Sequence, residues 1–216
     1  MIDARKDCSK SDDELPTVAE FDLSIESLQD LASIEQTQNG LSLTSKVHLT
    51  AGSHFSNITA YAPQAHRTWR TIQTSVSTHI DPRSALLYIN HSCDPSLEIH
   101  IRPSATPQQQ PADPNDQRQA LNQDHPTEPV GHVGEVKVSA TRPISPGDAL
   151  TFFYPSTEWS FDRPFQCNCG APPGVCIAVP QGACSLDRPT LERYFINEHI
   201  WRLVEEREQG NRTVET

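Results

Sequence analysis

The chain has 216 residues, enough for one domain with a core, and its 17 Lys and Arg against 28 Asp and Glu give a formal net charge of −11. This charge excludes the basic footprint of a nucleic-acid-binding protein and suits a cationic partner or simple solubility. No apolar run approaches the roughly 18 residues of a membrane span, and residues 1–7 lack the apolar core of a secretory signal. We therefore expect an intracellular protein, of the nucleus or cytoplasm, with reduced cysteines.

The N-terminal part of the chain changes from polar to amphipathic. Residues 1–19 mix charged and small polar residues without periodicity, which predicts a disordered tail that includes Cys8. From Phe21 to Ile34 the apolar residues begin as an alternation and then take helical spacing. This pattern predicts a short strand or turn followed by a helix near 24–35.

The central part of the chain has the pattern of short strands. Alternating apolar and polar residues, or runs of β-branched and aromatic ones, predict strands at 41–49, 68–76, 97–101, 134–140 and 149–154. The continuous apolar stretch 85–89 predicts a buried segment that runs into polar residues at Asn90. Residues 103–132 contain six prolines and six glutamines, which predicts a disordered insertion closing a hairpin, with a Pro-rich docking segment as the alternative.

The C-terminal part of the chain has a helical pattern. An apolar stripe predicts a helix over 189–207, and Pro189 suits its first turn. Short strands with helices at the edges indicate a mainly β fold, of the β-rich α+β kind. We divide the chain into a tail at 1–19, a main domain at 20–160, a cysteine segment at 161–185, and a C-terminal helix and tail at 186–216.

Six residues at 90–95, Asn-His-Ser-Cys-Asp-Pro, carry the strongest chemical signal. The cysteine inside this block, together with the remote Cys167, Cys169 and Cys176, indicates one metal site built from two distant segments. The Asn90-His91 pair also offers amide and imidazole groups to a small polar ligand.

Three blocks of the sequence resemble the SET-domain family, whose best-known members are protein lysine methyltransferases. Residues 88–95 look like the family's Asn-His-Ser-Cys block, and residues 146–154 look like its second block, a turn and strand ending in a tyrosine. The three late cysteines resemble its cysteine-rich extension, called post-SET. The resemblance covers residues 40–185 with the blocks in matching order, and residues 150–159 also look like a group of small fungal SET proteins.

The resemblance implies a SET-domain fold of small curved β-sheets around a pseudo-knot, with 20–160 as the SET-like domain and 161–185 as the post-SET segment. It also implies S-adenosylmethionine as a methyl donor, held by Asn90 and His91. Tyr154 would lie where the methyl group crosses to the acceptor amine, and its hydroxyl oxygen would orient both groups. The alternative for this residue is a buried tyrosine whose hydroxyl is satisfied by the backbone.

The roles of four other aromatic residues stay open between site and core. Tyr88 either lines the donor pocket as a cofactor-binding residue or packs in the core. Trp159, Phe161 and Phe165 lie between the tyrosine and the late cysteines. They either wall the channel for the acceptor lysine, as the resemblance implies, or pack in the core.

The resemblance further implies a zinc ion shared by Cys93 and the three late cysteines, Cys167, Cys169 and Cys176. Four thiolates close a tetrahedral structural site with Zn–S distances of about 2.3 Å. Pro172-Pro173-Gly174 widens the gap before Cys176 relative to the usual family spacing, and Cys184 is the alternative fourth ligand. Free thiols are the other interpretation of these cysteines.

The chain also departs from the family pattern. The early Gly-x-Gly turn has only Asn39-Gly40 and Ala51-Gly52 as candidates, and neither reproduces it. Leu87 and Ser96 stand where the family often has an arginine and an asparagine, and Phe153 replaces an acidic residue, which makes the site drier.

Three functions are compatible with this sequence. The first is S-adenosylmethionine-dependent methyl transfer to a protein lysine, with a basic Lys-containing peptide or protein as partner; intact Asn90, His91 and Tyr154 favour it. The second is a SET fold that binds a partner without chemistry. The third is a SET fold that acts on a small molecule in a biosynthetic pathway. The absent glycine turn favours the second or third. We lean toward an enzyme, a SET-type methyltransferase, with no direct nucleic-acid or membrane partner.

Overall fold

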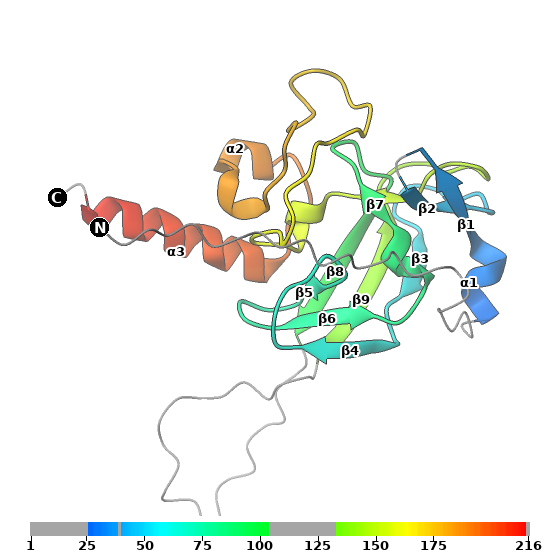
Figure 1. Cartoon of the computed structure of the whole chain (residues 1–216), viewed down its shortest axis with the longest axis horizontal. Helices are drawn as coiled ribbons and strands as arrows, with labels where there is room; N and C mark the ends of the chain where they lie inside the picture. Colours follow the sequence, from blue (N-terminus) through cyan, green and yellow to red (C-terminus); the bar gives the residue numbers. More distant parts are fainter. Residues whose placement is uncertain (1–25, 39, 104–132, 215–216) are drawn as a thin grey trace, which may run out of the picture.

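The computed structural model describes residues 26–38, 40–103 and 133–214 of the chain (Figure 1). The expected tail at 1–19 and the expected insertion at 103–132 lie, apart from residue 103, outside these residues. Within the described residues, short strands form several small sheets and helices are few, so the expectation of a mainly β fold is confirmed.

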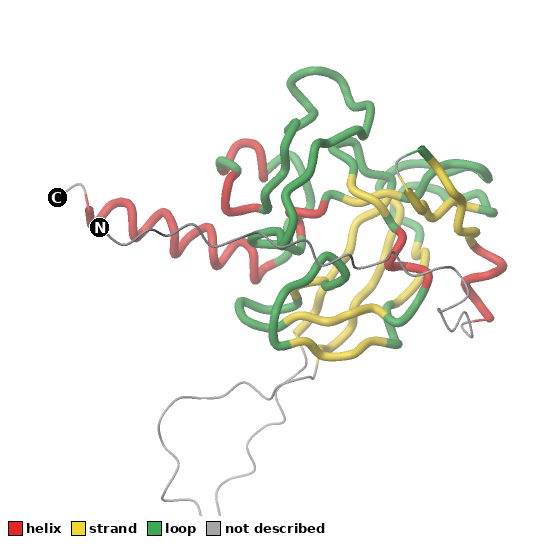
Figure 2. Tube along the Cα trace, viewed as in Figure 1, coloured by secondary structure: helices red, strands yellow, loops and turns green. Residues whose placement is uncertain are grey.

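Ten strands of the described residues form three small sheets (Figure 2). An antiparallel hairpin pairs β1 (Ala32–Thr37) with β2 (Gly40–Ser45). The five-stranded sheet has the order β3-β9-β8-β10-β7, with the bounds His54–Asn57, Val133–Ala140, Leu97–Pro103, Thr151–Phe152 and Asn90–His91. The three-stranded sheet has the order β4-β6-β5, with the bounds Tyr61–Gln64, His79–Pro82 and Ile72–Gln73.

Helices lie at the edges of these sheets. The α-helices are α1 (Glu26–Leu31), α2 (Arg188–Leu191) and α3 (Glu198–Val214). The part of the chain that the structure describes also has three short 3-10 helices, η2 (Ala85–Tyr88), η3 (Tyr154–Ser156) and η4 (Ala183–Ser185). Figure 1 shows α1 beside the β1–β2 hairpin at one end, and α3, in red, projecting from the sheets at the other.

The chain turns from helix to strand earlier than its apolar spacing predicts. The expected helix near 24–35 ends at Leu31, and β1 begins immediately after it. Ile34 of β1 lies opposite Leu43 of β2, and Gly40 at φ +105° takes a left-handed conformation where β2 begins. Cross-strand pairing therefore overrides the helical spacing.

Three strands are shorter than the sequence predicts. The strand expected at 41–49 ends at Ser45 as β2, because the Ser45 hydroxyl donates to the Val47 carbonyl (2.8 Å) and turns the chain. The strand expected at 68–76 is reduced to β5, because the Thr71 hydroxyl donates to the Thr68 carbonyl (3.0 Å) and accepts from the Thr68 N–H (2.9 Å), which closes a turn. The strand expected at 149–154 is reduced to β10, because Pro155 lacks an N–H and its fixed φ suits the first turn of η3.

The single helix expected over 189–207 is two helices with a break at 192–197. Asn197 at the end of this break is buried, and its side chain donates to the carbonyls of Ile99 (2.8 Å) and Ser156 (3.0 Å). Its Oδ1 accepts a backbone N–H of β8 (2.8 Å). The break therefore satisfies buried backbone groups and ties α3 to β8 and η3.

Two apolar clusters hold the sheets and helices together. In the larger one, β8 and β9 alternate inward-facing residues, of which the most deeply buried are Leu97, Ile99, Val136 and Val138. The smaller cluster packs α2 and α3 against the residue that precedes η3, through Phe153, Leu191, Ile200 and Val204. This second cluster fixes the direction in which the chain leaves β10.

Strand β10 lies between β7 and β8, the two strands that the loop 92–96 connects. It pairs with both of them in parallel. The buried hydroxyl of Ser96 accepts from the Thr151 N–H (3.0 Å) and donates to the Ala149 carbonyl (3.2 Å). This crossing brings the two sequence blocks together, in agreement with the expected pseudo-knotted SET-domain fold.

Candidate active site and cysteine cluster

A cavity of about 710 Å³ lies beside the crossing of β7 and β10. Its walls come mainly from the turn at 37–38, the loop 67–72, the segment 86–91, the segment 149–158 and the loop 161–169. Asn90, His91 and Tyr154 all line this cavity, so the structure brings three of the four predicted donor and catalytic residues to one place.

Asn90 reaches the cavity from β7 and ties that strand to the β1–β2 hairpin. Its Nδ2 donates a hydrogen bond to the Leu41 carbonyl (2.9 Å). Among the described residues none donates to its Oδ1. One end of the amide is therefore structural, and the other can accept a hydrogen bond from a ligand.

His91 is buried, and both of its ring nitrogens face protein atoms. Nδ1 accepts from the Tyr154 N–H (3.3 Å), and Nε2 lies 3.3 Å from Cys93 Sγ. Burial lowers the pKa of His91 to about 4, so the imidazole is neutral at physiological pH. A neutral ring that accepts at Nδ1 carries its proton at Nε2 and directs it toward the sulfur. The His91 side chain thus connects Tyr154 to the cysteine cluster.

Tyr154 begins η3 and points its ring among other aromatic rings. Its centroid lies 5.3 Å from His91, 6.0 Å from Phe161 and 6.1 Å from Phe165. Its hydroxyl donates to the Ile89 carbonyl (3.1 Å). This is the backbone hydrogen bond expected if Tyr154 is only a buried tyrosine. The oxygen keeps its acceptor lone pairs. Burial raises the pKa of Tyr154, as does the nearby Glu158 carboxylate, and the hydroxyl stays protonated.

Of the four aromatic residues whose roles the sequence did not decide, some line the cavity and the others pack in the apolar clusters. Tyr88 packs in the larger apolar cluster and is not among the residues that line this cavity. Phe161 and Phe165 line the cavity and stack on one another with ring centroids 6.0 Å apart. Trp159 packs instead against the smaller cluster.

Of the two glycine turns considered as candidates for donor contact, one lies at the cavity and the other does not. Thr37 and Gln38, at the turn of the β1–β2 hairpin, line the cavity, whereas the turn at Gly52 is not part of its lining. The hairpin turn that contains Gly40 is therefore the one whose position suits ligand contact.

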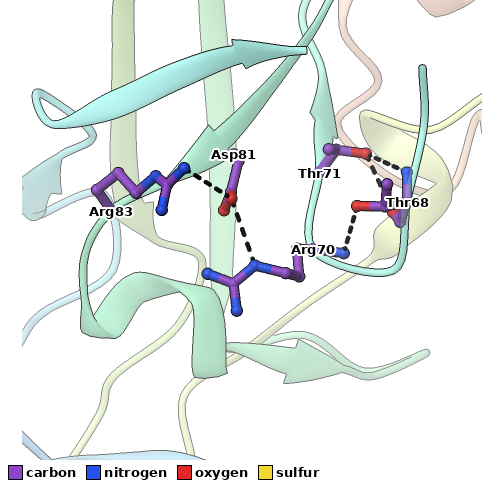
Figure 3. Close-up of polar contacts among 5 residues, drawn as sticks. All are labelled: Thr68, Arg70, Thr71, Asp81 and Arg83. Carbon is purple, nitrogen blue, oxygen red and sulfur yellow. Dashed lines mark hydrogen bonds and ion pairs between the residues drawn. The ribbon is translucent and has the colours of Figure 1, made fainter. Parts of the chain in front are cut away.

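The loop 67–72 forms another wall, and its conformation is set by the contacts in Figure 3. Arg70 Nε lies 3.3 Å from Asp81 Oδ2 on β6, and Arg83 contacts the same oxygen at 3.7 Å. The Thr68 hydroxyl accepts the Arg70 N–H (3.2 Å). This network holds the loop against the three-stranded sheet and so fixes the shape of the cavity.

Glu158 is a cavity residue that the sequence interpretation missed. It lies four residues after Tyr154, is only 8% exposed and lines the cavity. Its Oε1 accepts the Gln73 N–H (2.6 Å) and lies 3.4 Å from the Thr157 hydroxyl. Burial raises the pKa of this carboxyl to about 8. The sequence feature that could have identified it is its charge, since Glu158 is the one charged residue between positions 149 and 161.

Four cysteines from two distant segments meet behind His91. The sulfur atoms of Cys93, Cys167, Cys169 and Cys176 all lie within 4.8 Å of one another, with 3.9 Å between Cys93 and Cys167. Zn–S bonds of about 2.3 Å separate tetrahedral sulfurs by about 3.8 Å, so this donor set fits a four-thiolate zinc site. Cys184, the alternative ligand, does not belong to this group.

Comparison with known proteins agrees with the SET-domain fold. The family model for the SET domain matches residues 5–155. The chain is also similar to Methyltransferase flvH of Aspergillus flavus, with 36% identity over 163 residues that cover 76% of this chain and 74% of that protein. The chain therefore belongs to the SET-domain family. The family and this relative together support methyl transfer as the general class of reaction, and they do not determine the acceptor.

Similar solved structures include two of KRYPTONITE, one with mCHG DNA and SAH, the other with mCHH DNA, an H3(1-15) peptide and SAH. Their TM-scores are both 0.47, at 20% and 18% identity, over 68% of this chain. The chain spans 28% and 29% of those chains, less than a third of their length. A putative histone methyltransferase of Plasmodium falciparum matches with a TM-score of 0.39 at 13% identity, over 57% of this chain and 92% of its own. Within the described residues, no helix combines the length and apolarity needed to cross a membrane.

Proposed function

We propose that the protein transfers a methyl group from S-adenosylmethionine to an amine nitrogen, with the side chain of a protein lysine as the acceptor. The observation that carries this proposal is the meeting of Asn90, His91 and Tyr154 at one cavity. S-adenosylmethionine supplies a methyl group on a positively charged sulfur, which an uncharged amine can displace. The residues of the chain then have to hold the donor, align the amine and exclude water.

The donor is held in this proposal by Asn90 and by the backbone around it. The free Oδ1 of Asn90 is an acceptor suited to the donor's amino group or adenine. The turn at Thr37 and Gln38 closes the cavity from the hairpin side. His91 contributes by holding the Tyr154 backbone, since its own nitrogens face protein atoms.

Tyr154 aligns the reacting groups. Its O–H is directed to the Ile89 carbonyl, so the oxygen presents lone pairs rather than a proton to the cavity. Such an oxygen attracts the polarised hydrogens of a methyl group on sulfur and those of an approaching amine. The raised pKa of Tyr154 excludes the phenolate as a base at neutral pH.

We also propose that the cysteine cluster binds one zinc ion with a structural role. Four thiolates fill a tetrahedral coordination shell and leave no open position for chemistry. Crowded thiols, of which Cys93 has its pKa raised by burial to about 11, become thiolates more readily beside a dication. The ion would join the loop 161–176 to the Asn-His block and so complete one wall of the cavity.

A small molecule with both an amine and a carboxylate is the second candidate acceptor. Arg67 and Arg163 line the same cavity as Glu158, so cationic and acidic groups face one space. That pairing suits a zwitterion better than a lysine within a peptide, whose neighbouring backbone is neutral.

Transfer of an isotopically labelled methyl group tests both acceptors. The protein is incubated with labelled S-adenosylmethionine and either a library of lysine-containing peptides or a panel of free amino acids and diamines. Label on lysine peptides supports the first acceptor, and label confined to small amines supports the second. Absence of label from every amine, with the donor shown to be bound, contradicts methyl transfer to nitrogen.

A further inference from the structure

Glu158 lines the cavity, and one of its carboxylate oxygens fixes the position of the side chain. Oε1 accepts the Gln73 N–H at 2.6 Å and contacts the Thr157 hydroxyl. Oε2 accepts no hydrogen bond from any described residue, and it does not belong to the polar atoms that are buried without a partner. Since the residue lines the cavity, Oε2 is available to a ligand there.

The backbone around Glu158 is held from several sides. The Glu158 carbonyl accepts the Ala183 N–H (2.9 Å), and the Trp159 N–H donates to the Gln73 side chain (2.9 Å). On the other side, His199 contacts the Thr157 carbonyl at 3.0 Å. A carboxyl fixed in this way is preorganised, so its contact with a ligand costs little reorientation.

The charge on Glu158 is not balanced by a neighbouring protein cation. No described basic side chain forms an ion pair with it, and the Arg67 guanidinium acts only at longer range. Arg163 lines the same cavity but pairs with Asp162 (3.6 Å), and Tyr154, whose pKa Glu158 helps to raise, is neutral. Burial therefore dominates and raises the pKa of Glu158 to about 8, whereas a bound cation would lower it. An uncompensated carboxyl of this kind favours a cationic ligand.

The cavity that Glu158 lines suits an alkylammonium rather than a metal ion. Phe161 and Phe165 stack beside Tyr154 and line the same cavity. Aromatic faces attract an organic cation and accommodate its methylene groups. In the described residues, the group of potential metal ligands is the cysteine cluster, and Glu158 is not part of it.

We propose that Glu158 binds the ammonium form of the acceptor and takes its proton, which makes it a catalytic residue and defines the substrate class as an alkylamine. This inference rests on the proposed function. In the first step, a proton moves from R–NH₃⁺ to the Glu158 carboxylate and leaves R–NH₂. In the second, the nitrogen lone pair forms the C–N bond as the C–S bond of the donor breaks. The products are the methylammonium and S-adenosylhomocysteine, and the carboxyl proton then passes to solvent.

Titration with n-butylammonium chloride tests this step without requiring turnover. An alkylamine keeps its proton up to about pH 10, so at pH 9 the ammonium and an ionised Glu158 coexist. Calorimetry is carried out with and without saturating S-adenosylhomocysteine, which reports donor-site binding separately from ammonium binding. We expect Glu158→Gln to bind butylammonium at least tenfold more weakly than the wild type, because a charge-assisted contact is lost.

Glu135→Gln is the matched control, since it makes the same substitution at an exposed position on β9 outside the cavity. We expect its affinity for butylammonium to stay within twofold of the wild type. A carboxyl-carbon NMR signal of Glu158 that shifts on addition of butylammonium gives the same answer in the wild type, should the glutamine variant fail to fold. Equal binding by the wild type and Glu158→Gln, an equal loss in Glu135→Gln, or an unshifted signal would overturn the proposal.

Discussion

In the proposed mechanism, single residues at this site each combine a structural and a chemical task. Asn90 holds the hairpin with its nitrogen and leaves its oxygen to a ligand, and the Tyr154 hydroxyl donates to the backbone while its lone pairs stay available. The motif at 90–95 could predict which residues gather at the site. It could not predict the hydrogen bonds that decide which atom of each side chain is free, because those partners come from segments far away in the chain.

Replacement of Tyr154 by Phe separates alignment from binding. The ring contacts with His91 and Phe165 remain, so we expect donor affinity within threefold of the wild type. Loss of the aligning oxygen is expected to lower turnover at least 100-fold, or about 2.7 kcal/mol of transition-state stabilisation. Single-turnover transfer of labelled methyl groups measures the effect. Tyr61→Phe, which removes a hydroxyl outside the cavity, is the control. Unchanged turnover in Tyr154→Phe would remove this residue from the mechanism.

The titration of Glu158 also has a consequence for stability. Its pKa of about 8 in the folded state lies above the ordinary value of 4.5, so between these two pH values the folded state binds the proton more tightly than the unfolded state. The stabilising contribution is full below pH 4.5 and is lost as the pH rises to about 8. We expect the free energy of unfolding of the wild type, relative to Glu158→Gln, to fall by up to about 4 kcal/mol over this range.

Denaturant unfolding at pH 5, 7 and 9 measures this difference, and the subtraction cancels the titration of groups common to both proteins. Glu135→Gln, which removes an exposed carboxyl outside the cavity, is the control for this subtraction. Parallel curves for Glu158→Gln and the wild type would show that Glu158 titrates normally.

At the scale of elements, short-range signals could predict which segments are strands and helices better than where they end. β8 and β9 follow their apolar alternation closely. The break before α3 could not be predicted in this way, because it depends on Asn197 meeting carbonyls of β8 and η3. The reduction of β10 to two residues likewise reflects the crossing between β7 and β8, which is a property of the assembled sheet.

The cysteine cluster, which joins two distant segments of the chain, gives a specific prediction about zinc content. Protein purified without chelator is expected to contain one zinc per chain by elemental analysis, and Cys176→Ser is expected to lose most of it. Because metal binding and loop ordering are coupled, the backbone of 165–178 should then exchange its amide hydrogens faster. Cys184→Ser should retain the metal, since its thiol is not part of the cluster. Purified protein without zinc would contradict the four-thiolate site.

At the scale of the whole molecule, the cavity exists only where the three sheets and the late loop meet. Its walls combine residues from the hairpin, the loop 67–72, the crossing strands and the cysteine loop. The resemblance to the SET-domain family could predict this convergence, because it identified both blocks of the crossing. It did not identify Glu158, which is placed by contacts from Gln73 and Ala183 on separate elements.

If the cavity binds a methyl donor as proposed, calorimetric titration with S-adenosylmethionine measures that binding. We expect one donor molecule per chain for the wild type and at least tenfold weaker binding for Asn90→Ala, because the free amide oxygen is lost and the hairpin is released. Asn57→Ala, an exposed asparagine on β3, should bind like the wild type. No heat signal from the wild type at millimolar donor would contradict donor binding by this cavity, and full affinity in Asn90→Ala would contradict the role of Asn90.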